Sequence, residues 1–139
     1  KTKITLSDQK GSNVLLLFFP LAFTSVCTAE LCCVRDNLRF YEQLDVKPFG
    51  ISVDSIHVLA RYKSEQQLNF PLLSDFNKEV SALYGSLYEV FSYGMKGVSK
   101  RSAFLIDREG IVKYAEVLDN AGLQPDFEAI RVNLLSMNT

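Results

Sequence analysis

Cys27 stands where a very apolar segment, residues 14–19, gives way to a helical pattern that begins near Ser25. Unpaired backbone N–H groups and the positive end of the helix dipole stabilise a thiolate at such a position, and the thiolate is the nucleophilic form of cysteine. Thr24 can place its hydroxyl beside the sulfur, and Pro20 can line the pocket with apolar surface that limits water. Cys27 is therefore a candidate nucleophile with two candidate helpers in the same loop.

A cation and a carboxylate complete the set of candidate residues. Arg101 lies far along the chain, and a guanidinium stabilises both a thiolate and the negative charge that develops on a leaving oxygen. Glu30, one helical turn after Cys27, would support the pocket from behind or complement the helix N-terminus. The other four residues also have purely structural explanations: Cys27 as a buried filler, Pro20 as a strand terminator, Thr24 as a helix cap and Arg101 as one of several surface cations.

Two segments carry a resemblance to a known family. The spacing Pro-x3-Thr-x2-Cys of residues 20–27, the string FFPLAFTSVCTAEL around it, and the pattern Arg-x2-Phe-x2-Asp of residues 101–107 resemble the active-site signature of peroxiredoxins of the AhpC/TSA superfamily. The resemblance implies a thiol-dependent peroxidase, an antioxidant enzyme that reduces hydrogen peroxide and organic hydroperoxides. It also implies that the Cys27 thiolate attacks the terminal peroxide oxygen and becomes a sulfenic acid, while water or an alcohol leaves.

Cys32, five residues after Cys27, is a candidate resolving cysteine. The Cys-x4-Cys spacing resembles the bacterioferritin-comigratory (Q) branch, whereas FFPLAFTSVC and NFPLLSDFNKEV resemble the alkyl hydroperoxide reductase E branch, in which an external thiol completes the cycle. Five residues of intact helix rise about 7.5 Å, more than the ~4.4–6.8 Å between Cα atoms that a disulfide tolerates, so a bridge requires the first turns to unwind. By helical periodicity Cys32 lies on the solvent side, where the alternative to a resolving role is an idle surface thiol. We expect Cys33 to serve in packing or in a dimer contact.

Length and composition bound the other possibilities. The 139 residues, 47% of them hydrophobic, fit a single domain over residues 1–139. The 15 basic and 16 acidic residues are interspersed, which argues against nonspecific attraction to nucleic acid or anionic membranes. The longest apolar run, residues 14–23, is too short to span a membrane. Three cysteines do not form a disulfide framework, which favours a reducing compartment such as the cytoplasm.

The resemblance also bears on partners. It implies a hydroperoxide as substrate, a thioredoxin-like or mycoredoxin-like protein as reductant, and homodimers as a common assembly. We expect no cofactor and no metal. The resemblance further implies a segment with a short hairpin ahead of Thr2, so that the sequence given describes an incomplete N-terminal part.

The elements that must position the candidate residues follow from periodicity. Residues 14–19 predict a strand buried on both faces, and Ser25 to about Leu44 predicts one helix. The order of elements, together with the resemblance, predicts an α/β protein of thioredoxin-like fold, with a central mixed β-sheet flanked by helices. The further expected elements are strands at 2–6, 48–53 and 71–73, helices at 56–68, 75–84 and 126–137, a loop at 86–99, and a hairpin of 102–107 with 111–117.

Other functions stay open on the sequence alone. A thiol-disulfide oxidoreductase of the same fold normally needs Cys-x2-Cys at the helix start, where this chain has Glu30 as the fourth residue. A metal-binding module would use Cys27, Cys32, Cys33 and His57, whose spacing matches no common zinc pattern. A non-catalytic thioredoxin-like binding domain would keep the fold without thiol reactivity.

Overall fold

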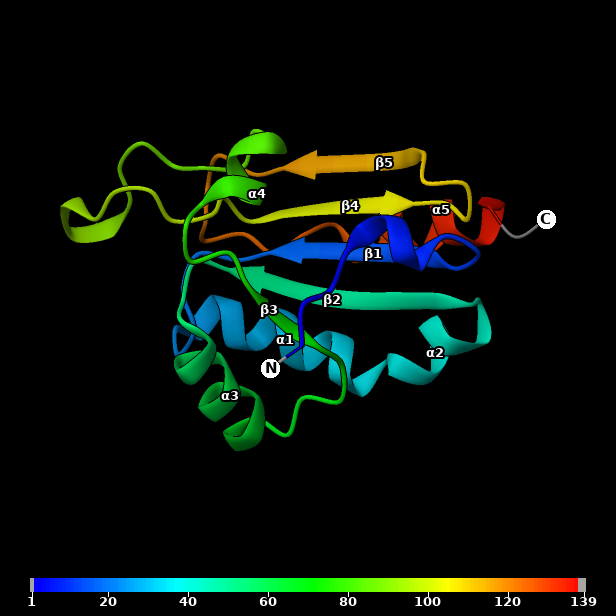
Figure 1. Ribbon diagram of the computed structural model, residues 1–139, viewed down its shortest axis with the longest axis horizontal. Helices are drawn as coiled ribbons and strands as arrows, with labels where there is room; N and C mark the ends of the chain where they lie inside the picture. Colours follow the sequence, from blue (N-terminus) through cyan, green and yellow to red (C-terminus); the bar gives the residue numbers. More distant parts are fainter. Residues whose placement is uncertain (1, 138–139) are drawn as a thin grey trace.

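The computed structural model describes residues 2–137, which form one five-stranded sheet with helices on both faces (Figure 1). Two short 3-10 turns, η1 (Leu6–Gln9) and η2 (Ser92–Gly94), complete the secondary structure of the described residues. The strands are β1 (Asn13–Phe18), β2 (Val46–Ser52), β3 (Leu72–Ser74), β4 (Ser102–Ile106) and β5 (Val112–Val117), and the helices are α1 (Ser25–Asp36), α2 (Leu38–Gln43), α3 (Ile56–Glu65), α4 (Glu79–Leu83) and α5 (Phe127–Met137).

The sheet is mixed, with β1 at its centre. The strand order is β3-β2-β1-β4-β5; β1 runs parallel to β2 and antiparallel to β4. All six residues of β1 are buried, as its uninterrupted apolar sequence predicts for a strand covered on both faces. The predicted α/β architecture, a mixed sheet flanked by helices, is confirmed.

Side chains of β1 alternate between two hydrophobic clusters. Leu15 and Leu17 pack with residues of α1, α3 and α5 on one face of the sheet. Leu16 and Phe18 point to the other face, where the Phe18 ring lies 5.4 Å from that of Tyr84 at the end of α4. Figure 1 shows α4 in front of the sheet and α5 behind it. The strand that leads to the candidate nucleophile is thus fixed from both sides.

Two predicted elements are wrong. The single helix expected from Ser25 to about Leu44 is two helices, which meet at Asn37 with φ −113° and ψ 15°. The Asn37 side-chain amide donates to the carbonyl of Cys33 at 2.8 Å, and such local side-chain bonds compete with helix continuation. The edge strand expected at residues 2–6 is absent from the described chain, because so short an alternating segment makes few cross-strand contacts.

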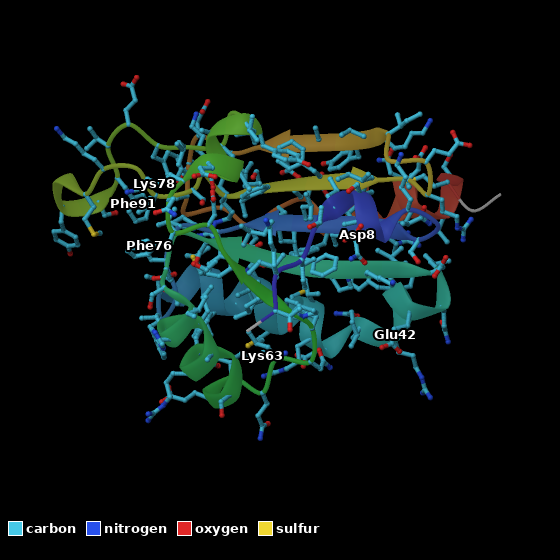
Figure 2. The ribbon with its side chains drawn as sticks, viewed as in Figure 1. Asp8, Glu42, Lys63, Phe76, Lys78 and Phe91 are labelled. Carbon is cyan, nitrogen blue, oxygen red and sulfur yellow. The ribbon has the colours of Figure 1, made fainter. Side chains whose placement is uncertain are left out.

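The segment at residues 86–99 is mostly loop, as predicted, and it extends beyond the sheet (Figure 1). An isolated bridge between Leu87 and Ser99 closes its base. The rings of Tyr88 and Phe91 stack within it, with centroids 5.6 Å apart. Figure 2 shows the Phe91 side chain at the same end of the molecule as Lys78. The chain therefore leaves the sheet in this loop and returns to it at Arg101, directly before β4 (Ser102–Ile106).

Candidate active site

Cys27 lies in the first turn of α1, directly after the loop that follows β1. The last sheet bond of this segment runs from the Phe19 amide to the carbonyl of Ile51, at 2.9 Å. Pro20 is buried and has no N–H, so the ladder ends there and the chain turns toward the helix. Only 1% of the Cys27 surface is exposed. The sulfur is therefore held at a helix start inside the protein.

The Arg101 guanidinium reaches Cys27 from the start of β4, the strand that lies beside β1 on the side away from β2. Arg101 directly precedes β4, the strand that pairs with β1. Its Nη2 donates to the Cys27 sulfur at 3.3 Å, and its Nη1 donates to Glu30 Oε1 at 2.7 Å. Its Nε donates to the carbonyl of Ala121 at 3.0 Å. Since only 2% of Arg101 is exposed, this charge acts on the sulfur without much screening by water.

Glu30 is fully buried in the same cluster. Its Oε1 pairs with Arg101, while Oε2 is buried with no hydrogen-bond partner among the described residues. Burial raises the pKa of Glu30 to about 7, although the charge of Arg101 and its hydrogen bond oppose that rise. The cluster thus holds one permanent cation and two groups that can become anions. Its charges balance when Cys27 is a thiolate and Glu30 carries a proton.

Thr24 is the residue before α1, in an extended conformation with φ −101° and ψ 153°. Its hydroxyl donates to the carbonyl of Leu21 at 2.8 Å and makes no side-chain cap of the helix. Thr24 therefore occupies the N-cap position of α1, as its structural explanation expects, but its hydroxyl does not cap the helix. Among the described contacts, the one recorded for this hydroxyl closes the loop rather than reaching the sulfur.

Asp54 anchors the same loop, a role that sequence reasoning missed. Its Oδ2 accepts from the backbone N–H of Ala22 at 2.8 Å and from the Ser52 hydroxyl at 2.7 Å. The neighbouring Ser55 caps α3, since its side chain accepts from Val58 N at 3.2 Å. The parallel strands β1 and β2 end at the same edge of the sheet, so the segments that follow them lie side by side. This pairing could have indicated that Asp54, after β2, contacts the loop after β1.

Phe23 is the strained residue of the loop. It is 50% exposed and has a φ of 65°, a conformation that bulky side chains rarely adopt. Its ring lies 4.9 Å from the ring of Tyr62, a fully buried residue of α3. The Tyr62 hydroxyl is 2.7 Å from that of Thr28. Sequence reasoning did not identify Tyr62 or Thr28, because their meeting depends on how α3 packs against α1.

The structure does not bring Cys32 to the nucleophile. Residues 27 and 32 lie in one continuous helix, where five residues place side chains about 140° apart around the axis. Cys32 is half-buried against the main cluster, with its sulfur 3.8 Å from Gln66 Oε1, so the expected position on the solvent side is wrong. Periodicity missed this because Gln66, the residue that follows α3, contacts α1 on that side. Cys33 is also half-buried, and burial raises the pKa of its thiol.

No group of three or more histidine, cysteine, aspartate or glutamate side chains within residues 2–137 is arranged to hold a metal ion. His57 is exposed on α3, whereas the three cysteines lie in α1 and are buried or half-buried. None of the helices in the range is both long and apolar enough to cross a membrane.

Residues 1–115 match the AhpC/TSA family. Alkyl hydroperoxide reductase E of Mycobacterium bovis is 39% identical over 117 residues, which cover 82% of this chain and 73% of that protein. The chloroplastic 2-Cys peroxiredoxin BAS1 of Spinacia oleracea is 34% identical over 129 residues, or 87% of this chain and 46% of that protein.

Solved structures agree. The crystal structure of peroxidoxin BcpB from Mycobacterium tuberculosis superposes with a TM-score of 0.83 at 26% identity, covering 96% of this chain and 86% of that one. Bacterioferritin comigratory protein of Xanthomonas campestris shares the fold, with a TM-score of 0.89 at 24% identity over 99% of this chain and 86% of that one. The chain therefore belongs to the AhpC/TSA family and is a peroxiredoxin, a thiol-dependent peroxidase.

Proposed function

We propose that Cys27 is the nucleophile of this peroxidase and that Arg101 is its electrostatic partner. The observation that carries the proposal is the 3.3 Å contact between Arg101 Nη2 and the Cys27 sulfur, two side chains that are both almost fully buried. The thiolate attacks the terminal oxygen of a hydroperoxide; the S–O bond forms, the O–O bond breaks, and the leaving alkoxide or hydroxide takes a proton from water. Cys27 is then a sulfenic acid. The guanidinium stabilises the thiolate before attack and the leaving oxygen during it.

Thr24 and Pro20 shape the approach of the peroxide in this proposal. A hydroxyl has one donor and two acceptor positions, and the Thr24 donor is already directed at Leu21. Its oxygen is then free to accept a hydrogen bond from the O–H of the incoming peroxide. Pro20, buried at the end of β1, keeps bulk water from the sulfur. The half-exposed Phe23 ring beside them supports organic hydroperoxides as substrates in addition to hydrogen peroxide.

Glu30 holds the guanidinium in place behind the sulfur. The 2.7 Å contact between Glu30 Oε1 and Arg101 Nη1 fixes one arm of the fork, which leaves Nη2 aimed at Cys27. The carboxyl also adjusts the charge of the cluster, since its raised pKa lets it carry a proton near neutral pH. Glu30 is therefore a positioning residue that acts through Arg101.

We propose Cys32 as the resolving cysteine. Its thiolate attacks the Cys27 sulfenic acid, the S–S bond forms, the S–O bond breaks, and the leaving hydroxide becomes water by taking up the proton that Cys32 released on ionising. A thioredoxin-like or mycoredoxin-like protein then supplies the two electrons that reduce the disulfide. Cys32 is partly exposed and lies in the same helix as Cys27, five residues along, which supports this assignment once the helix between them opens. An external thiol that attacks the sulfenic acid directly is the competing route.

The wider setting is proposed on the same basis. A single domain over residues 1–139 is supported by the one sheet that all five strands join. A cytoplasmic location and a thiol reductant fit three cysteines that are all free. A homodimer is the assembly that we propose from the family resemblance.

One experiment tests the cycle. Fully reduced protein is treated with one equivalent of hydrogen peroxide in the presence of dimedone, and the intact mass and the peptides are then measured. Loss of two hydrogens that maps to Cys27 and Cys32 supports the two-cysteine cycle, whereas a dimedone adduct on Cys27 supports the external thiol. The matched control is Cys33→Ser, which removes a half-buried neighbouring thiol and should leave the pattern unchanged. Absence of rapid reaction at Cys27 would contradict its role as nucleophile.

A further inference from the structure

A chain of hydroxyl groups connects α3 to the start of α1. The Thr28 hydroxyl donates to the carbonyl of Thr24 at 2.7 Å. A threonine hydroxyl has a single hydrogen, so in the 2.7 Å contact between Thr28 and Tyr62 the donor must be Tyr62. Burial raises the pKa of Tyr62 to about 12, so this phenol keeps its hydrogen at neutral pH. The chain therefore runs from Tyr62 through Thr28 to the backbone of the loop residue Thr24.

The Tyr62 ring supports the same region. It is fully buried, with its centroid 4.9 Å from the Phe23 ring and 6.3 Å from the Phe19 ring. Phe23 holds the strained positive φ of the loop, and a strained conformation persists only where its surroundings enforce it. Tyr62 therefore contacts both ends of the segment that carries the nucleophile: the loop before α1 and the first turn of α1.

Gln66, the residue that directly follows α3, makes a second set of contacts with α1. Its side-chain Oε1 is 3.8 Å from the Cys32 sulfur. Its carbonyl accepts from Arg35 Nη1 at 2.6 Å. Tyr62 and Gln66 are four residues apart, so they present one face toward α1. That face contacts α1 at Thr28 and at Cys32, on either side of the turn that separates the two cysteines.

We propose that Tyr62 is a positioning residue that latches the first turn of α1 and thereby limits how fast Cys27 reaches Cys32. This inference rests on the proposed role of Cys32 as the resolving cysteine. The two sulfurs face different sides of an intact helix, so the disulfide forms only after residues 27–32 leave their helical conformation. That opening must break the hydrogen bond between Tyr62 and Thr28 and the contact between Gln66 and Cys32.

The latch sets a partition between two fates of the sulfenic acid. While α1 is closed, Cys27 stays beside Arg101, and a second peroxide can oxidise its sulfenic acid to a sulfinic acid. Once α1 opens, Cys32 captures the sulfenic acid as a disulfide. A tighter latch thus favours sulfinic acid at high peroxide concentration, and a looser latch favours the disulfide.

Tyr62→Phe tests the latch because it removes the hydroxyl and keeps the ring. Hydrogen exchange of the backbone amides of residues 28–32 in the reduced protein should become about fivefold faster, as expected for loss of one net hydrogen bond. Rapid-quench mass spectrometry should show the disulfide forming about fivefold faster after one equivalent of hydrogen peroxide. At excess peroxide, the sulfinic acid fraction should fall.

Tyr41→Phe is the matched control. Tyr41 is a second buried tyrosine of the same hydrophobic cluster, 5% exposed, and within the described residues no hydrogen bond from its hydroxyl to α1 is recorded. In Tyr41→Phe the exchange rate of residues 28–32, the rate of disulfide formation and the sulfinic acid fraction should match those of the wild-type protein. Thr28→Val interrupts the hydroxyl chain at its middle member and should accelerate exchange and disulfide formation in the same direction as Tyr62→Phe.

The outcomes separate the latch from the proposed resolving role. Equal exchange of residues 28–32 in the wild-type protein and in Tyr62→Phe would overturn the latch, whatever the disulfide does. Faster exchange in Tyr62→Phe, with no disulfide between Cys27 and Cys32 in either protein, would overturn the resolving role of Cys32. The proposal that Tyr62 limits the rate of disulfide formation would fall with it, and the hydroxyl chain would have only a structural role. Faster exchange with an unchanged disulfide rate would show that another step limits resolution and would also overturn the proposal.

Discussion

Arg101 and Cys27 are 74 positions apart in sequence, and their side chains meet at 3.3 Å between Nη2 and Sγ. The same guanidinium donates through Nη1 to Glu30 and through Nε to the carbonyl of Ala121. All three nitrogens are thereby engaged, and the planar group is fixed in one orientation. The backbone is fixed as well, because the carbonyl of Arg101 accepts from Leu118 N at 2.9 Å. The sulfur thus faces a cation whose direction is set before any substrate arrives.

Replacement of Arg101 should slow the attack on peroxide. Arg101→Met is expected to lower the second-order rate constant by about 100- to 1000-fold, the usual cost of one electrostatic donor in an active site. This change leaves Glu30 buried without its cation, which would destabilise the fold. The rate is therefore measured also in the double variant Arg101→Met with Glu30→Gln, which removes the unpaired charge and should fold like the wild-type protein. Stopped-flow competition kinetics provide the measurement.

The matched control for Arg101 is Arg131→Met. Arg131 is an exposed arginine of α5 paired with Glu128 at 2.6 Å, so its removal should leave the rate constant unchanged. A full rate in the double variant would mean that the guanidinium contact has no catalytic role. Arg101→Lys keeps a charge without the fork, and an intermediate rate is expected.

The raised pKa of Glu30 should make the free energy of unfolding fall as the pH rises toward neutral. Burial raises the pKa of Glu30 from 4.5 to about 7, so between these values the folded protein holds a proton that the unfolded chain has released. The contribution of this group to the free energy of unfolding is present at low pH and is lost as the pH rises toward about 7. Urea unfolding at several pH values should show this slope in the wild-type protein and a flatter one in Glu30→Gln.

Glu128→Gln is the control for that experiment. Glu128 is exposed, and its hydrogen bond with Arg131 holds the pKa of its carboxyl below the ordinary value. Its contribution is lost only as the pH falls through that lower range, so the slope between pH 4.5 and 7 should match the wild type. An identical slope in Glu30→Gln and the wild type would show that Glu30 titrates normally.

Thr24 should contribute to rate more than to folding. Thr24→Val removes a hydroxyl that closes the loop onto Leu21 and that is proposed to accept a hydrogen bond from the peroxide. We expect the rate constant for peroxide to fall by about 10- to 100-fold, and Thr24→Ser to recover most of it. Ser25→Ala, at the neighbouring exposed position, serves as the control. If Thr24→Val and Thr24→Ser were equally slow, the hydroxyl would not be the relevant group.

Asp54 should matter for the rate because it fixes the loop before the nucleophile. Asp54→Ala leaves the Ala22 amide and the Ser52 hydroxyl without their acceptor. We expect about 1–3 kcal/mol of lost stability and a slower reaction with peroxide, since a displaced loop misplaces the residues it carries. Thermal unfolding and stopped-flow kinetics measure the two effects.

Asp119→Ala is the control for Asp54, because Asp119 is exposed and pairs only weakly, at 3.3 Å, with Lys100. Its stability and rate should be those of the wild type. A normal peroxide rate in a destabilised Asp54→Ala would limit Asp54 to a structural role.

Much of the architecture could be predicted from the sequence because local rules decide it. The unbroken apolar run of β1, the proline that follows it and the helical spacing after Ser25 specify a buried strand, a turn and a helix in that order. The same order puts Cys27 at a helix start. The motif spacing added Arg101 and Glu30 as candidates, which no local rule could have joined to the cysteine.

Only the tertiary structure decided how the helices meet. The position of Cys32 could not be judged from α1 alone, because on the side that periodicity assigns to solvent its sulfur contacts Gln66, the residue that follows α3. The break at Asn37 depends on one side-chain hydrogen bond, which a periodic pattern does not reveal. Asp54 bonds the Ala22 amide from 32 positions away. Periodicity reports which faces of one element are apolar, whereas these contacts depend on the packing of two elements, and packing is a property of the whole chain.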